Sequence, residues 1–251
     1  MVIQIALFIF AGFVGGAVNA VAGGAKLFVF PMLLAAGMPP LVANATGTIA
    51  LWPALIPAAW ILRVDLAKKF RTQLKLVIPA LLGALCGAFS LIWSTESLFL
   101  ITIPFLLILA LGAILLGDRA VDITRRFFPA DRLKSVTGIL LFAIGFYGGY
   151  FGAGMGFMLI AVLSVARGLS IRQANASKIL FAFCINLTAV IPLTFSGLVD
   201  WTAAGSVLIG GLLGGYFGAK LTQVVSQKTL RLAILALGVI LIFSFLIRMR
   251  Q

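Results

Sequence analysis

Apolar runs separated by short polar or basic segments make up almost the whole chain. In the first half the runs cover residues 2–22, 26–37, 41–62, 72–93 and 97–117, and in the second half residues 135–152, 155–166, 171–196, 201–223 and 229–247. A helix needs about 20 apolar residues to cross a bilayer, and most of the runs have about that length. The pattern therefore predicts an all-α, polytopic membrane protein with roughly 8 to 10 membrane segments.

The runs at residues 26–37 and 155–166 are too short to cross a bilayer alone, so we interpret them as half-helices. Each follows a glycine-rich segment. A broken helix is tolerated in lipid only where its freed backbone groups face protein or a water-filled cavity. The sequence leaves open whether each glycine-broken pair crosses twice or dips in and returns. Paired interruptions of this kind in the two halves of a repeat indicate the binding site of a transporter.

The two halves of the chain repeat one pattern. Both begin with G-F-x-G-G, at Gly12 and at Gly145, and both carry the sequence A-N-A followed by a hydroxyl residue, Thr46 or Ser177. We therefore divide the chain into a first transmembrane repeat at residues 1–117, a basic cytoplasmic connector at residues 118–134 and a second transmembrane repeat at residues 135–251.

The charges of the loops indicate how the two copies are oriented. Basic residues crowd the segments at residues 63–75 and 119–134, whereas residues 94–97 and 196–201 include none. An excess of Lys and Arg is typical of cytoplasmic loops. Matching Val-Asp pairs end at Asp65, in a basic loop, and at Asp200, in a loop without basic residues. We therefore expect inverted-topology repeats, although Arg248 and Arg250 then fall on the outer side.

Composition supports the same class of protein. Hydrophobic residues make up 63% of the 251 positions and charged residues only 10%, with a mean hydropathy of +1.21. The net charge of +13 does not indicate a nucleic-acid partner, because Lys and Arg lie in loops between apolar runs. The lipid bilayer is the expected surrounding. We interpret residues 2–22 as mature structure, since the basic start of a signal peptide is absent before them.

The titratable residues argue against an enzyme. The chain has no His, and its acidic residues all lie in or beside loops, at Asp65, Glu96, Asp118, Asp122, Asp131 and Asp200. Cys86 and Cys184 lie in apolar runs without metal-ligand spacing, so we expect them to be buried. The sequence contains no Ser/His/Asp set and no phosphate-binding loop. We therefore expect no catalytic residue, no metal site and no cofactor.

Two lysines interrupt the apolar runs. Lys26 follows Gly23 and Gly24 at the start of the first short run, and Lys178 lies about two turns into the run at residues 171–196. Ionisable residues at membrane depth are functional hypotheses by default. A long side chain can also reach an interface and keep its charge in water. The glycine-broken context favours a functional role for Lys26, and for Lys178 the two alternatives are equally open.

Polar residues suited to bind a substrate cluster around the glycine breaks and in the first turns of the following helices. Unpaired N–H groups and the helix dipole favour an anion at such helix starts. The alternative is hydrogen bonding between helices, above all for Ser and Thr. The candidate substrate-binding residues are Asn19, Gly23, Gly24, Lys26, Asn44, Thr46, Thr48, Gly152, Gly154, Asn175, Ser177, Lys178 and Asn186.

Other glycines have the small-xxx-small spacing of closely packed membrane helices. These pairs are Gly83 with Gly87, Gly211 with Gly215, and Gly214 with Gly218. In the repeat, Gly83 and Gly87 match Gly214 and Gly218. We expect these glycines to pack helices together and to have no direct contact with a substrate.

These motifs resemble those of the sulfite exporter TauE/SafE family, also called the 4-toluene sulfonate uptake permease family. The similarity rests on the G-F-x-G-G starts, the A-N-A-T and A-N-A-S segments and the Val-Asp pairs, and it spans essentially the whole chain. It implies movement of sulfur-containing or related organic anions across the bacterial inner membrane. The first glycine-rich break departs from the family pattern at Ala25-Lys26, where the second copy has Gly156-Phe157.

The resulting hypothesis is a secondary transporter that binds sulfite, a sulfonate or sulfoacetate between the two repeats and releases it by alternating access. Export is favoured, because a negative cell interior drives an anion outward without a coupling ion. The alternatives are an uptake permease for organic anions, an anion channel and a structural membrane subunit. The expected partners are a small anion and lipid, and a homodimer is left open.

Overall fold

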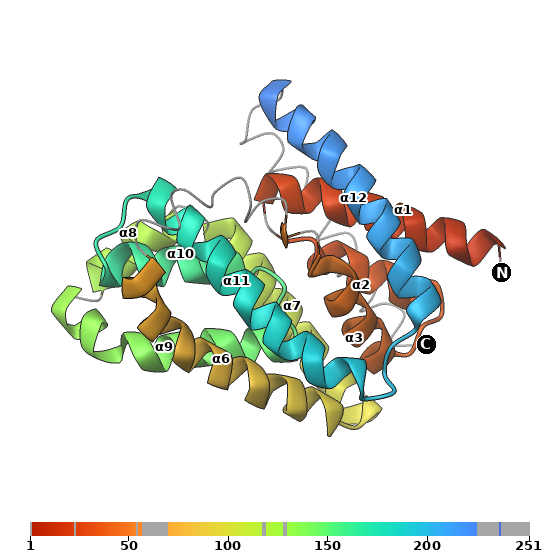
Figure 1. The fold of residues 1–251 in the computed structure, drawn as a ribbon, viewed down its shortest axis with the longest axis horizontal. Helices are drawn as coiled ribbons and strands as arrows, with labels where there is room; N and C mark the ends of the chain where they lie inside the picture. The colour runs from red at the N-terminus through yellow and green to blue at the C-terminus, as the bar shows by residue number, and fades with distance from the viewer. Residues whose placement is uncertain are drawn as a thin grey trace.

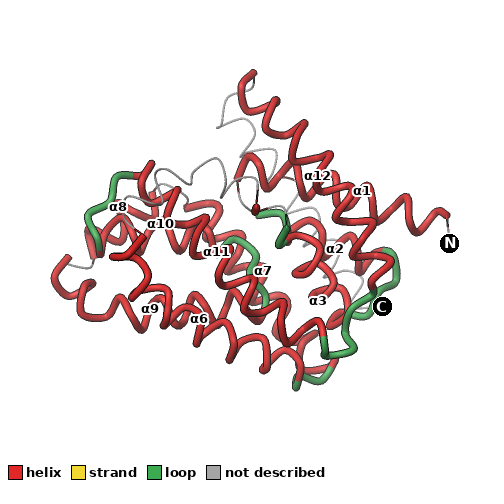
Figure 2. The backbone as a smooth tube through the Cα atoms, viewed as in Figure 1, coloured by secondary structure: helices red, strands yellow, loops and turns green. Residues whose placement is uncertain are grey.

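The computed structural model describes residues 2–22, 24–53, 55–56, 70–116, 119–127, 130–224 and 236. These residues form α-helices joined by short loops (Figure 1), and no strand occurs among them (Figure 2). In chain order the helices are α1 (Val2–Ala22), α2 (Lys26–Ala35), α3 (Pro40–Leu51), α6 (Phe70–Ile92), α7 (Glu96–Leu116), α8 (Arg119–Phe127), α9 (Ala130–Tyr150), α10 (Met155–Ala166), α11 (Ile171–Thr194) and α12 (Trp201–Val224). The all-α prediction is confirmed for this part of the chain. Gly23, Asp65 and most of the predicted run at residues 229–247 lie outside it.

Helices of membrane-spanning length are present. Within the described ranges, four helices are long and apolar enough to cross a bilayer, namely α1, α6, α7 and α11. Shorter apolar helices occur at Lys26–Ala35, Pro40–Leu51, Ser135–Tyr150, Met155–Ala166 and Trp201–Phe217. The predicted half-helices correspond to α2 and α10, which have 10 and 12 residues. The total of roughly 8 to 10 membrane segments stays a prediction.

The connector predicted at residues 118–134 contains a helix that the sequence analysis did not expect. This helix is α8, and it packs against α10 and α7. Val121 on α8 is buried, whereas Asp122 and Arg126 are exposed. The high charge of the segment gave no sign of this helix, so part of the predicted connector is helical.

α1 and α12 cross with their backbones in direct contact (Figure 1). A Cβ atom added to Gly12 would overlap the backbone of Val207, and one added to Gly214 would overlap the backbone of Phe13. Every other amino acid carries a Cβ atom, so only glycine permits this approach. The crossing holds the first helix of the chain against the last helix that the structure describes in full.

α6 and α9 make a second crossing of the same kind. A Cβ atom added to Gly83 would overlap the carbonyl oxygen of Phe142, and one added to Gly145 would overlap that of Ala80. Gly87 lies against Phe146 in the same way. The packing role predicted for the small-xxx-small glycines is therefore confirmed for Gly83 and Gly87 here, and for Gly214 in the first crossing.

The two crossings correct one detail of the sequence repeat. Gly83 and Gly87 lie against Phe142 and Phe146, and in the same relation Gly210 and Gly214 lie against Ile9 and Phe13. The contacts thus pair Gly83 with Gly210, one helical turn before the partner that the sequence match assigned to it. Both crossings also join the first helix of one predicted copy to the glycine-containing helix of the other copy, so the two halves interlock.

The neighbouring glycine pairs contribute less than predicted. Cβ atoms added to Gly211 and Gly215 would stay 3.7 and 3.9 Å from the nearest carbonyl oxygen, which is an ordinary contact distance. The backbones of Gly211 and Gly215 still take part in the crossing, because a Cβ atom added to Gly16 of α1 would overlap the carbonyl oxygen of Gly211 and the backbone nitrogen of Gly215. The glycine required at that contact is therefore Gly16. The surroundings of Gly218 lie outside the described part of the chain.

The outer faces of the long helices are apolar. Ile101 and Phe105 on α7 and Phe217 on α12 are all more than half exposed. Side chains of this kind suit contact with lipid.

Cys86 on α6 is exposed too, so its predicted burial was wrong, while Cys184 is half-buried. In a membrane protein, a residue in an apolar run can contact either the lipid or the protein interior. The apolar run alone does not show which of the two it contacts.

Candidate functional site

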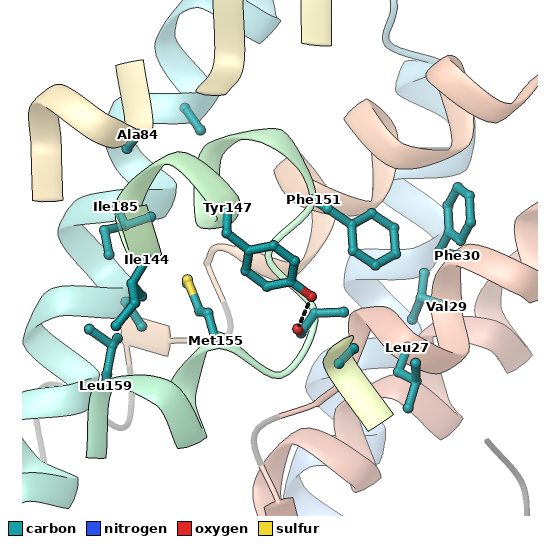
Figure 3. Packing of buried hydrophobic residues seen from close by; sticks show 14 of the residues in the cluster. Leu27, Val29, Phe30, Ala84, Ile144, Tyr147, Phe151, Met155, Leu159 and Ile185 are labelled. Carbon is teal, nitrogen blue, oxygen red and sulfur yellow. Dashed lines mark hydrogen bonds between the residues drawn. The ribbon is translucent and has the colours of Figure 1, made fainter. Parts of the chain in front are cut away.

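The second glycine break lies between α9 and α10 and is closed by its own hydrogen bonds. The N–H groups of Phe151 and Gly152 both donate to the carbonyl oxygen of Tyr147, each at 2.8 Å. The Tyr147 hydroxyl donates to the carbonyl oxygen of Ala153 at 2.6 Å (Figure 3). Gly152 and Gly154 have φ of +82° and +72°, in the left-handed region that favours glycine. The chain therefore turns sharply here, as the glycines predicted.

Phe151 connects this break to the first half of the chain. Its ring packs edge-on against Phe30 of α2, with the two ring centroids 5.4 Å apart (Figure 3). Phe30 in turn contacts Phe99 of α7, at 6.2 Å between centroids. All three rings are buried. They form a buried aromatic cluster between the second glycine break and α2, the short helix of the first copy.

Lys26, the first residue of α2, lies beside this aromatic cluster. Its side chain is only 8% exposed, and its Nζ atom donates to the Thr48 hydroxyl at 2.5 Å. The same ammonium lies 5.6 Å from the centroid of the Phe151 ring, within the range of a cation–π interaction. The charge of Lys26 is therefore held against buried side chains from both halves of the chain, and it does not extend to an exposed helix end.

No carboxylate neutralises this charge within the part of the chain that the structure describes. The Thr48 hydroxyl donates its own proton to the carbonyl oxygen of Asn44 at 2.8 Å, so it acts only as an acceptor toward Lys26. An ammonium has three N–H donors, and the Thr48 contact uses one of them. A buried charge is costly unless an opposite charge compensates it. The geometry is thus suited to an anion.

Asn44 anchors the same face of α3 to the second glycine break. Its side-chain Nδ2 donates to the carbonyl oxygen of Tyr150 at 2.8 Å, and its side chain is fully buried. Asn44 and Thr48 are one helical turn apart, so both side chains project from one face of α3. Of the predicted residues, the structure therefore brings together Lys26, Asn44 and Thr48 next to the glycine break that contains Gly152 and Gly154.

The other candidates on α1 and α3 have different surroundings. Thr46 is buried on the opposite side of α3, where its hydroxyl accepts from the N–H of Asp200 at 3.1 Å. Asp200 also caps α12, because its Oδ1 accepts from the N–H of Ala203 at 2.9 Å. Thr46 thus fastens α3 to the start of α12. Gly24 packs near Ile114 of α7, and Asn19 is half-buried on α1.

On α11 the side chains of two candidates bond to their own helix. Ser177 donates to the carbonyl oxygen of Gln173 at 3.0 Å, and Asn186 to that of Ala182 at 2.7 Å. The stem of Lys178 runs past Gly156, where an added Cβ would come within 3.0 Å of Lys178 Cδ. The side chain of Asn175 lies outside the described part of the chain. The roles predicted for these residues stay predictions.

The sequence analysis overlooked the aromatic residues of the second break. Phe151 provides the ring face for Lys26, Tyr147 closes the loop and Tyr150 provides the carbonyl oxygen that holds Asn44. The only signal in the sequence was their position among glycines, because an aromatic residue in an apolar run is otherwise typical of a helix that faces lipid or core.

Comparison with known proteins shows the family of this chain. The model of the family described as "Sulfite exporter TauE/SafE" matches residues 8–245. The chain belongs to this family. The chain is also similar to a probable membrane transporter protein of Haemophilus influenzae, which is 29% identical over 234 residues, or 90% of this chain and 88% of the relative.

Other relatives have the same kind of name. The probable membrane transporter protein YfcA of Escherichia coli K12 is 25% identical over 88% of this chain and 82% of its own length. A probable membrane transporter protein of Xylella fastidiosa is 27% identical over 94% of this chain and 92% of its own length. No solved structure matches the chain significantly. This TauE/SafE chain is therefore a membrane transporter with several apolar helices.

Proposed function

We propose that this transporter moves a small sulfur-containing anion, of the sulfite, sulfonate or sulfoacetate class, and that it exports the anion across the bacterial inner membrane. The observation that carries the proposal is the buried Lys26 ammonium, which has no carboxylate partner in the described residues. The name of the family supports the sulfur oxyanion class. Lys26, Thr48 and Asn44 are proposed as the first copy's part of the binding site.

The direction follows from charge. Moving one elementary charge across the membrane exchanges about 2.3 kcal/mol per 100 mV, so a negative interior drives an anion outward. Export of this kind needs no proton relay. The sequence has no His, and its few carboxylates lie in or beside loops, which suits a carrier without such a relay.

Alternating access is the proposed mechanism, with the site between two inverted repeats. Because the crossings of α1 with α12 and of α6 with α9 each join one helix of each copy in close backbone contact, the parts that rock in this proposal are the two crossed pairs. Lys26 and Phe151 also come from different copies and meet at the site. Movement of one crossed pair relative to the other would change the contacts of the substrate.

Cysteine labelling tests the inverted topology. After replacement of Cys86 and Cys184, a single cysteine at Lys69 should be protected from an impermeant thiol reagent in intact cells. A single cysteine at Val199 should be labelled, because its loop contains no basic residue and is expected outside. Opening the cells should make the cysteine at position 69 reactive, which is the control for its accessibility. Equal labelling of both positions in intact cells would contradict inverted repeats.

Counterflow tests the transport function itself. Proteoliposomes loaded with unlabelled sulfite, or with a short sulfonate, should accumulate the labelled form of the same anion transiently and with saturable kinetics. A carrier behaves in this way because each site binds one anion per cycle. Liposomes without protein provide the control. Flux that does not saturate would indicate a channel, and no flux for any sulfur anion would contradict the proposed function.

A further inference from the structure

The side-chain oxygen of Asn44 is a buried acceptor without a donor. Asn44 is 0% exposed, and its Oδ1 has no hydrogen-bond partner within the described part of the chain. Leaving a buried amide oxygen unpaired is costly, and most such atoms in folded proteins have a partner. An exception in a candidate binding site points to a group that the ligand brings.

The orientation of the Asn44 amide is fixed by its other end. Nδ2 donates to the carbonyl oxygen of Tyr150 at 2.8 Å. If the amide were turned over, Oδ1 would face the Tyr150 oxygen, and two acceptors would then oppose each other. The unpartnered atom is therefore the oxygen, and the partner that it requires is a hydrogen-bond donor.

Two unmet requirements thus lie on one face of α3. Thr48, one turn after Asn44, holds the Lys26 ammonium, whose positive charge has no buried counter-charge among the described residues. Asn44 Oδ1 requires a donor. A ligand that satisfies both must combine a negative charge with a hydrogen-bond donor, and an O–H group is a donor that a small oxyanion can carry.

We propose that the site selects singly charged oxyanions that carry a hydroxyl group of their own, with Asn44 Oδ1 accepting the hydrogen bond from that hydroxyl. This inference deepens the proposed function and rests on it, since Lys26 provides the contact to the charge. Hydrogensulfite and short hydroxysulfonates have this chemistry.

Dianions such as sulfate lack this combination of a single negative charge and a hydroxyl group. A dianion would place a second negative charge beside one ammonium and would bring an oxyanion without a proton to the amide oxygen of Asn44. Because Oδ1 is fully buried, a ligand reaches it only when the site opens, as a rocking transporter requires. The same amide oxygen would then discriminate between anions at the moment of loading.

A pair of sulfonates with the same shape tests the proposal on the wild-type protein. 2-Hydroxyethanesulfonate and 1-propanesulfonate have the same charge and differ by a hydroxyl in place of a methyl group. Burial alone would favour the more apolar 1-propanesulfonate. We expect the purified protein in detergent to bind 2-hydroxyethanesulfonate about tenfold more tightly or better, measured by calorimetry. Sulfate should not displace it. Equal affinity for the two sulfonates, or equal competition by sulfate, would overturn the proposal.

A variant assigns the preference to Asn44. Asn44→Leu removes the acceptor at similar size, so the ratio of the two affinities should fall to about one or reverse. The control is Thr188→Val, which removes a hydroxyl that donates to the Cys184 carbonyl oxygen of its own helix at 2.9 Å. It should keep the wild-type ratio. An unchanged ratio in Asn44→Leu would overturn the role of Asn44, and the wild-type comparison decides the selectivity even where this variant does not fold.

The outcomes separate this inference from the proposed function. If both sulfonates bind the wild type equally and Lys26→Met weakens both, the proposed function stands and the inference alone is wrong. If neither sulfonate nor hydrogensulfite binds the wild type, the proposed function is wrong and the inference fails with it.

Discussion

Lys26→Met should weaken the binding of sulfite or a sulfonate roughly ten- to a hundredfold, because a charge-assisted contact contributes about 1.5 to 3 kcal/mol. Methionine has nearly the length of lysine and keeps the apolar part of the side chain. The amount of folded protein should stay close to that of the wild type, since the variant removes a buried charge that no described carboxylate compensates. Calorimetry on the purified proteins measures the affinity, and thermal unfolding measures the stability.

Lys26→Arg should restore only part of the affinity. The positive charge returns, but a planar guanidinium replaces a compact ammonium that fits between Thr48 and the ring of Phe151. Lys75→Met, which removes an exposed lysine of α6, is the matched control and should bind like the wild type. If Lys26→Met itself binds and transports like the wild type, Lys26 has no part in the site. The search would then move to Lys178 and Asn175 on α11.

The helices were predictable because lipid imposes a simple length rule. The run at residues 155–166 matches α10 at both ends, and the run at residues 2–22 matches α1. The register between helices was harder. Gly83 matched Gly214 by sequence, yet the contacts pair Gly83 with Gly210. Glycines recur every four residues, which is about one helical turn, so the sequence alignment of the two copies can shift by one turn and still match glycine with glycine. The helix α8 was missed because charged residues make up much of its sequence.

The candidate site was predictable only in part. Lys26 stood out because a charge in an apolar run is rare, and the hydroxyl of Thr48 proved to be its partner. The face of α3 was not readable from composition, so Thr46 was grouped with Thr48 although the two lie on different sides of the helix. Phe151 could not be chosen from the many aromatic residues of the chain. Its role depends on a long-range contact, which no local pattern encodes.

Gly214→Ala should destabilise the folded protein by about 1 to 3 kcal/mol, the typical cost of overpacking. The added methyl group would overlap the backbone of Phe13, and backbone cannot move aside as the end of a flexible side chain can. The helices α1 and α12 would therefore have to separate along their whole crossing. Thermal unfolding and the yield of monodisperse protein measure the effect, and Gly214→Leu should be worse, because a larger side chain enters the same space.

Gly205→Ala on the same helix is the matched control. A Cβ atom at position 205 would meet nothing within 4 Å, so this variant should be neutral or about 0.5 to 1 kcal/mol more stable, as expected for Gly to Ala in a helix. The difference between the two variants isolates the crossing from the general effect of removing a glycine. Normal stability of Gly214→Ala together with lost counterflow would instead place Gly214 on the path of the substrate. The interlocking of the two halves at α1 and α12 would then be a moving contact, and the rigid crossing would have to be sought at α6 and α9.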